Sequence, residues 1–205
     1  MCKRETVILD TDFMNYMIRA KDIKDNTYIF NKIINDLEIN PVIHEFLYEK
    51  EMMINPLVKK LVDEGVIKVI KYEDFLEDIN DSYYSKLFSD LYKYCNGREL
   101  DYGNSDFSTY QESEANLGEI HSVILAMYTG YTLFFSNDNG SKSMVNAKIN
   151  TEQYQLKVKN VMDIFEELAT MDKKTITKKD FDSLTKGDKG RKSYIKSIKE
   201  KWIEW

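Results

Sequence analysis

The sequence predicts an α/β fold in which helices cover both faces of a mainly parallel sheet. Short apolar runs rich in β-branched or aromatic residues at 6–9, 66–70 and 132–135 have the composition of buried strands, and 155–159 is a weaker fourth strand. Longer segments between them carry apolar residues at helical spacing. This alternation favours parallel pairing, because a crossover between parallel strands is usually a helix.

The first strand ends at the polar sequence Asp10-Thr11-Asp12, and helical sequence follows it. The segments that we expect to be helical in the first part of the chain are residues 13–23, 28–37, 40–54 and 56–65. Asn40 and Pro41 open the third of these as an N-cap and a proline at the first helical position. Gly65 suits the left-handed residue that ends the fourth.

The second half repeats the pattern around one long loop. We expect, in order, helical sequence at 73–95 with a break near Asn80, a polar loop at 96–114, a helix at 116–128 that Gly130 stops, and a closing helix at 161–168. A loop of that length is uncommon inside a compact domain and is often functional. Tyrosines concentrate beside it, where they would pack a core or an interface, or stack on bases.

Charge divides the chain into an acidic body and a basic tail. The whole sequence has 35 acids and 29 Lys plus Arg, for a net charge of −6. Residues 171–205 hold 11 Lys plus Arg and 6 acids, so they carry +5 and leave −11 on residues 1–170. We therefore expect one domain at 1–170 and a basic helical C-terminal extension at 171–205. The body's field excludes a general DNA-coating protein, because it repels phosphates.

Two functions are open for the tail. Its lysines and arginine would bind a phosphate backbone, or its helices would dock on the body or on a second subunit through Trp202, Ile203 and Trp205. Docking is favoured, since two tryptophans among the last four residues are costly to leave in water.

Composition places the protein in the cytoplasm. The chain is 42% hydrophobic and 31% charged, which is typical of a soluble globular protein. Cys2 and Cys95 are too few for a disulfide framework and lack the paired spacing of a zinc site. Neither a signal peptide nor a membrane span is evident, so we expect no membrane association.

Acids follow two of the predicted strands. Asp10 and Asp12 come after the first strand, and Asp138 comes after the strand at 132–135. Clustered carboxylates repel one another unless a cation lies between them, and hard oxygen ligands suit Mg²⁺ or Mn²⁺. The structural alternative is capping: Asp12 would cap the following helix, and Asn116 with Glu119 has the spacing of a capping box.

Four segments in this order resemble PIN-domain nucleases: the first strand with Asp10, the sequence NPVIHEFL with Glu45, the sequence GEIHSVILA with Glu119, and the sequence FFSNDNG with Asp138. The resemblance covers residues 6–169 and implies a three-layer α/β/α sandwich with a central parallel sheet. It also implies that acids gather at one end of that sheet and bind Mg²⁺ or Mn²⁺.

The resemblance assigns roles residue by residue. The catalytic acids would be Asp10, Glu45, Glu119 and Asp138; the metal ligands Asp10, Asp12, Glu119 and Asp138; and the substrate-binding residues Ser136, Asn139 and Lys142. Glu45 is the weakest match, because it flanks an apolar helical stripe and would also suit solvent. The sequence departs from the family in having Asp12 where Ser or Asn is common, Glu119 where many toxins have Asp, and a longer tail.

The implied function is metal-dependent hydrolysis of phosphodiester bonds, with RNA favoured over DNA as the nucleic acid bound. Two rival functions stay open: a PIN-like module that binds RNA or protein without turnover, and a structure-specific DNA nuclease. A second copy of the chain or an inhibitor protein is a further candidate partner. We expect His44 and His121 to be helix-surface or supporting residues and Cys95 to pack in the core.

Overall fold

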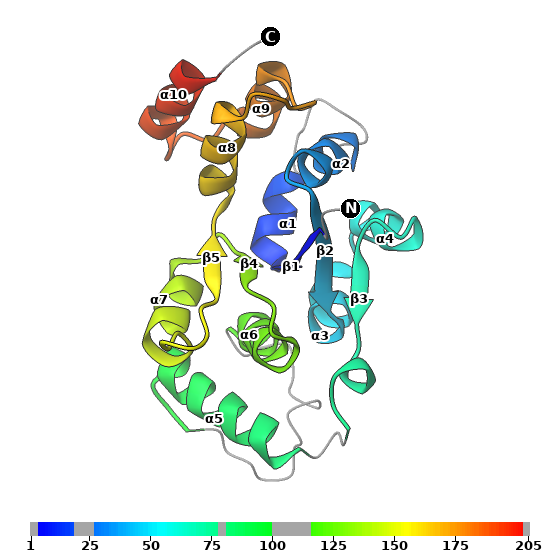
Figure 1. Cartoon of the computed structure of the whole chain (residues 1–205), viewed down its shortest axis with the longest axis vertical. Helices are drawn as coiled ribbons and strands as arrows, with labels where there is room; N and C mark the ends of the chain where they lie inside the picture. The colour runs from blue at the N-terminus through cyan, green and yellow to red at the C-terminus, as the bar shows by residue number, and fades with distance from the viewer. Residues whose placement is uncertain (1–3, 19–26, 78–80, 100–115, 203–205) are drawn as a thin grey trace.

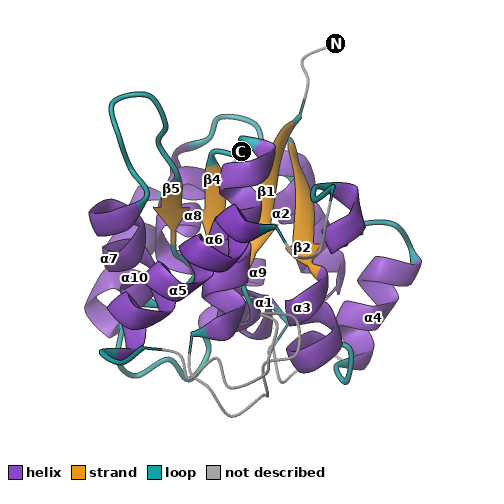
Figure 2. Cartoon of the chain, turned by 90° about the horizontal axis from the view of Figure 1, so that it is seen from below, coloured by secondary structure: helices purple, strands orange, loops and turns teal. Residues whose placement is uncertain are grey.

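The computed structural model describes residues 4–18, 27–77, 81–99 and 116–202. Its centre is a five-stranded sheet with the strand order β3-β2-β1-β4-β5, in which every neighbouring pair is parallel (Figures 1 and 2). The strands are β1 Glu5–Leu9, β2 Ile39–His44, β3 Lys68–Ile70, β4 Leu133–Phe135 and β5 Lys157–Lys159. The predicted α/β fold with a parallel sheet is confirmed.

Helices cover both faces of this sheet. The helices and helical turns of the described chain are α1 Thr11–Met17, α2 Thr27–Asp36, α3 Glu45–Leu47, the π-helical turn η1 Tyr48–Met52, α4 Pro56–Asp63, the 3₁₀ turn η2 Tyr72–Asp74, α5 Ser82–Asn96, α6 Leu117–Thr129, α7 Asn139–Lys148, α8 Val161–Thr170, α9 Lys178–Thr185 and α10 Lys192–Lys201. The last two belong to the tail. Helix α6 packs against β1, β2 and β4, whereas α1 packs against α8 on the opposite face (Figure 1). Right-handed crossovers produce this division, because the chain moves from β1 toward β3 and then returns to β4.

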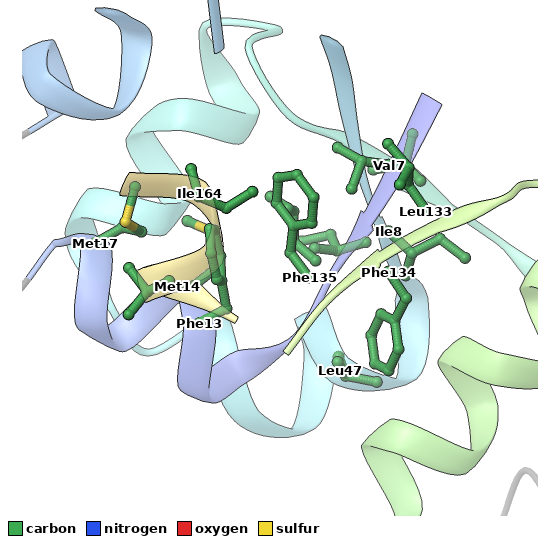
Figure 3. Packing of buried hydrophobic residues seen from close by; sticks show 14 of the residues in the cluster. Val7, Ile8, Phe13, Met14, Met17, Leu47, Leu133, Phe134, Phe135 and Ile164 are labelled. Carbon is green, nitrogen blue, oxygen red and sulfur yellow. The ribbon is translucent and has the colours of Figure 1, made fainter. Parts of the chain in front are cut away.

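The core lies on both sides of the central strands. Val7, Ile8 and Leu9 of β1 are completely buried. In β4, Phe134 and Phe135 point to opposite faces, and the Phe135 ring lies 5.1 Å from the Phe13 ring of α1 (Figure 3). Strands covered on both faces need apolar side chains in both directions, which explains the continuous apolar runs in the sequence.

The predicted helix at 40–54 is wrong in its first five residues. Residues 39–44 form β2, between β1 and β3, and helical structure begins only at Glu45. Pro41 pairs with Val7 of β1, but the pairing with β3 starts one residue later, at Val42. Proline is tolerated in this inner strand because it lies outside the ladder to β3, where its missing N–H would be needed.

The remaining element predictions hold with three exceptions. Helix α7 was not predicted, and the helix at 13–23 ends at Met17, with residues 19–26 outside the described ranges. Of the helical sequence predicted before the break near Asn80, only the 3₁₀ turn η2 forms, and residues 75–77 are not helical. Gly65 and Gly130 adopt the expected left-handed conformation, each with φ of 70°. The loop predicted at 96–114 begins after α5, and residues 100–115 lie outside the described part of the chain.

The tail packs on the body through α8. Trp202, at the end of α10, is 7% exposed and stacks on Phe181 of α9 at 5.3 Å. Phe181 in turn contacts Phe165 of α8 at 4.7 Å. Docking of Trp202 is therefore confirmed, whereas Trp205 is outside the described residues. Within the described ranges, no helix is both long and apolar enough to cross a membrane.

Candidate active site

Asp10 lies at the carboxyl end of β1 and is 2% exposed. Its carboxylate is the N-cap of α1 and accepts a hydrogen bond from the backbone N–H of Thr11 at 2.8 Å. The Ser136 hydroxyl donates to the other carboxylate oxygen, Oδ2, also at 2.8 Å. The cap expected from Asp12 is thus made by Asp10 instead, and Asp12 is an exposed residue of the first helical turn.

Asp138 follows β4, the strand next to β1. Its carboxylate is the N-cap of α7 and accepts from the backbone N–H groups of Gly140 and Ser141 at 3.0 and 3.3 Å. Its own N–H donates to Ser136 Oγ at 3.2 Å. The buried Ser136 hydroxyl therefore connects the segments that carry Asp10 and Asp138. Strand order reverses between β1 and β4, which is where parallel α/β sheets bind ligands.

Glu119 lies in the first turn of α6, and the predicted capping box with Asn116 is not formed. Asn116 has a left-handed backbone with φ of 67° and makes no side-chain cap hydrogen bond. Burial and the negative charges of nearby carboxylates together raise the pKa of Glu119 to about 7, against a hydrogen bond from its own backbone N–H that lowers it. These carboxylates belong to Glu51, Asp138 and Asp12.

The same repulsion acts on Asp10. Burial raises its pKa well above the ordinary value, and the charge of Glu119 raises it further, while the hydrogen bonds from Ser136 and Thr11 lower it. Asp12 adds a smaller repulsion. The four acids that the sequence assigned to a metal thus lie in one region of the molecule, because the charge of Glu119 acts on Asp10 and the charges of Asp138 and Asp12 act on Glu119.

Glu51 joins this cluster and was missed by sequence reasoning. It belongs to η1, and its carboxylate accepts a hydrogen bond from the Thr11 hydroxyl. A Cβ atom at Gly118 would lie 2.8 Å from Glu51 Oε1, so glycine at this position makes room for the acid. Nothing in the local sequence separates Glu51 from Glu49. The available signal was Gly118, because a glycine inside a helix can mark a close approach.

Glu45 interacts with a different part of the molecule. Its carboxylate accepts from the backbone N–H of Tyr72 at 2.5 Å. Burial raises its pKa, and the charges acting on it come from Glu49, Lys71 and Glu73, on the η1 and η2 side. Glu51, and not Glu45, is therefore among the acids whose charges raise the pKa of Glu119.

The substrate-binding candidates fall into two groups. Ser136 is 1% exposed and its hydroxyl is engaged with Asp10, so its position suits holding the acids. Asn139 and Lys142 are exposed at the start of α7, immediately after Asp138.

Both histidines are completely buried, so the surface expectation is wrong. Helix α6 lies between the sheet and α5, which covers His121, and His44 is the last residue of β2. Their rings stack at 5.3 Å, and the Tyr84 hydroxyl lies 2.7 Å from His121 Nδ1. His44 Nδ1 accepts from the backbone N–H of Phe46 at 3.0 Å. We therefore interpret His44 and His121 as residues that support the core.

Cys95 packs as predicted. Its sulfur lies 3.3 Å from the sulfur of Met144 in α7. Burial, together with the charges of Glu119 and Asp138, raises the pKa of the thiol to about 11. The thiolate is therefore disfavoured at neutral pH, which argues against a nucleophilic role.

The donor chemistry of the cluster fits a hard divalent cation. The side-chain donors are carboxylate oxygens, which Mg²⁺ and Mn²⁺ prefer, and the repulsion that raises the pKa of Glu119 is what a cation would relieve. In the arrangement seen here, no three His, Cys, Asp or Glu side chains of the described residues lie close enough together to chelate an ion. Comparisons with protein-family models, curated proteins and solved structures give no match to this chain.

Proposed function

We propose that the protein is a metal-dependent nuclease that hydrolyses phosphodiester bonds, acting as an endoribonuclease. The observation that carries the proposal is the placement of Asp10 and Asp138 at the carboxyl ends of the adjacent strands β1 and β4, joined through Ser136 and faced by Glu119. The resemblance of these segments to PIN-domain nucleases supports it.

The acids would have separate tasks. Asp10, Glu119 and Asp138 would hold Mg²⁺ or Mn²⁺, with Asp12 beside them. A bound ion lowers the pKa of water and offsets the charge that develops on the phosphate. Ser136 keeps the Asp10 carboxylate fixed through its hydrogen bond to Oδ2. Preorganisation of this kind avoids the cost of reorienting the acid during the reaction.

Residues at the start of α7 would meet the phosphate. Lys142 is exposed one turn after Asp138, so its ammonium would offset a phosphate charge, and the Asn139 amide would orient a phosphate oxygen. The preference for RNA over DNA comes from the family resemblance alone.

The test is a comparison of substrates with purified protein. Single-stranded RNA, duplex DNA and flapped DNA are incubated with Mn²⁺ or Mg²⁺, with chelator as the blank and Asp10→Asn as the control for contaminating nuclease. We expect cleavage of RNA that requires the ion and is lost in the variant. Cleavage of flapped DNA alone would make the protein a structure-specific DNA nuclease. No cleavage of any substrate, where a known PIN-domain nuclease is active, would refute the proposal.

A further inference from the structure

Lysines surround a hollow of about 650 Å³ between α9 and α10, on the tail. Those that line it are Lys186, Lys189, Lys192, Lys196 and Lys199. Two come from the turn between the helices and three from α10. The hollow is much larger than a single small anion needs, and its lining holds five lysines against two acids, Asp182 and Asp188.

Helix α10 has a lysine face and a separate apolar face. Lys192, Lys196 and Lys199 follow the i, i+4, i+7 spacing, which places them on one stripe of the helix. Another face buries Ile198 completely and leads into Trp202, which packs on α9. When the tail docks, the lysine stripe therefore faces the hollow and is not buried against the body.

Part of this positive charge makes no ion pair among the described residues. Lys199 pairs with Asp182 of α9 at 2.7 Å, and Lys196 approaches Glu200 at 3.9 Å. No ion pair joins Lys189 or Lys192 to another of the described residues. Like charges at i, i+4 spacing repel each other. An anion in the hollow would relieve that repulsion.

The hollow is connected to the acids through α1. Asp188, at its edge, accepts a hydrogen bond from the Tyr16 hydroxyl of α1 at 3.1 Å, and the Arg191 guanidinium lies 5.5 Å from the centre of the Tyr16 ring. Asp10 caps the same helix six residues earlier. At 1.5 Å per residue, the backbones of Tyr16 and Asp10 lie about 9 Å apart along the axis of α1.

We propose that this hollow binds the phosphate backbone of single-stranded RNA beside the segment held at the acids, an inference that rests on the proposed function for what becomes of the RNA. Lysine ammonium groups bind phosphates as point charges and do not read sequence. The body carries −11 and repels RNA, so productive binding needs a cationic surface near the acids. The lysine hollow supplies such a surface.

The test compares two double variants with the same change in charge. Lys189→Ala/Lys192→Ala removes two lysines of the hollow that form no ion pair with another described residue. Lys59→Ala/Lys68→Ala removes two exposed lysines from α4 and β3. Binding of a short fluorescein-labelled single-stranded oligouridylate is measured by anisotropy in chelator over a series of salt concentrations, so that cleavage plays no part. Melting temperatures establish that both variants are folded.

For two lost contacts, each worth about 0.7 in the slope of log K against log salt, the hollow variant should bind about 25-fold more weakly near 0.1 M salt, with a slope shallower by about 1.4. The control variant should bind like the wild type, and the deoxy oligonucleotide should show the same loss in the hollow variant. Unchanged binding by the hollow variant, an equal loss in the control, or no binding by the wild type would each overturn the inference.

Cleavage is measured separately with Mn²⁺. Binding through the hollow without cleavage by the wild type would refute the nuclease and leave the inference standing. If the wild type cleaves RNA and the hollow variant binds it as tightly as the wild type does, the nuclease proposal stands and the inference about the hollow is refuted.

Discussion

Replacement of Trp202 by alanine tests whether the tail is an integral part of the fold. The indole is 7% exposed, stacks on Phe181 at 5.3 Å and has the Lys174 ammonium 5.5 Å from its ring centre. Truncating a buried tryptophan to alanine costs about 3–5 kcal/mol. The end of the chain can relax into the space, so we expect the lower end of this range, about 3 kcal/mol.

That loss corresponds to a clear change in melting temperature. A chain of 205 residues loses about 2–4 °C per kcal/mol, so Trp202→Ala should melt about 6–12 °C below the wild type. Lys196→Ala is the control on the same helix, since its side chain is 80% exposed, and it should change the stability by no more than about 0.5 kcal/mol.

Fluorescence gives an independent assay, because both tryptophans of the chain, Trp202 and Trp205, lie in the tail. In a Trp205→Phe variant the emission comes from Trp202 alone. It should be shielded from acrylamide and become exposed at the temperature at which far-UV circular dichroism reports loss of the helices. The docking would be refuted if Trp202→Ala lowered the melting temperature by less than about 2 °C, or if acrylamide quenched Trp202 freely in the native protein.

Three further predictions concern the site and its supports. Asp10→Asn and Asp138→Asn should each abolish most RNA cleavage and leave the melting temperature in chelator unchanged or raised, because asparagine keeps the cap and removes a repelling charge; a sharp fall in both would mark the acids as structural. Ser136→Ala should cost about 1–3 kcal/mol by chemical denaturation, because it strips a buried carboxylate and an N–H of their partner, and Ser136→Thr, which keeps the hydroxyl, should retain more of the activity. Burial lowers the pKa of His44 to about 3, so the unfolded chain, with a histidine pKa near 6.5, binds the extra proton between these values. Stability should therefore fall as the pH drops below about 6.5, by up to about 1.4 kcal/mol per pH unit from this residue, and His44→Asn should make the measured fall shallower.

The strands that carry Asp10 and Asp138 could be located from sequence because their signals are local. Each is a short apolar run that ends in polar residues, and the carboxyl ends of parallel strands meet at one edge of a sheet. Helix α6 was located with similar ease, since Gly130 ends it with the left-handed conformation that glycine adopts without strain. The four acids assigned to a metal follow from these elements.

Other features depend on partners that are distant in the chain. Asn40 and Pro41 have the local signature of a helix start, yet pairing with β1 and β3 makes residues 39–44 a strand, and the register leaves Pro41 outside the ladder to β3. Tertiary pairing prevails here because the sheet buries β2 and satisfies its backbone hydrogen bonds. These gains outweigh the local preference of Asn40 and Pro41 for a helix start.

By itself, then, the sequence determined the α/β class, the positions of β1, β4 and α6, and the identity of Asp10, Glu119 and Asp138 as acids at the ends of those elements. Only the tertiary structure decided that Glu51 joins them, that His44 and His121 stack in the core, and that the tail's lysines line a hollow. The physical reason is that hydrophobic periodicity and turn chemistry act over a few neighbouring residues. Long-range packing, by contrast, decides which side chains from separate elements face one another.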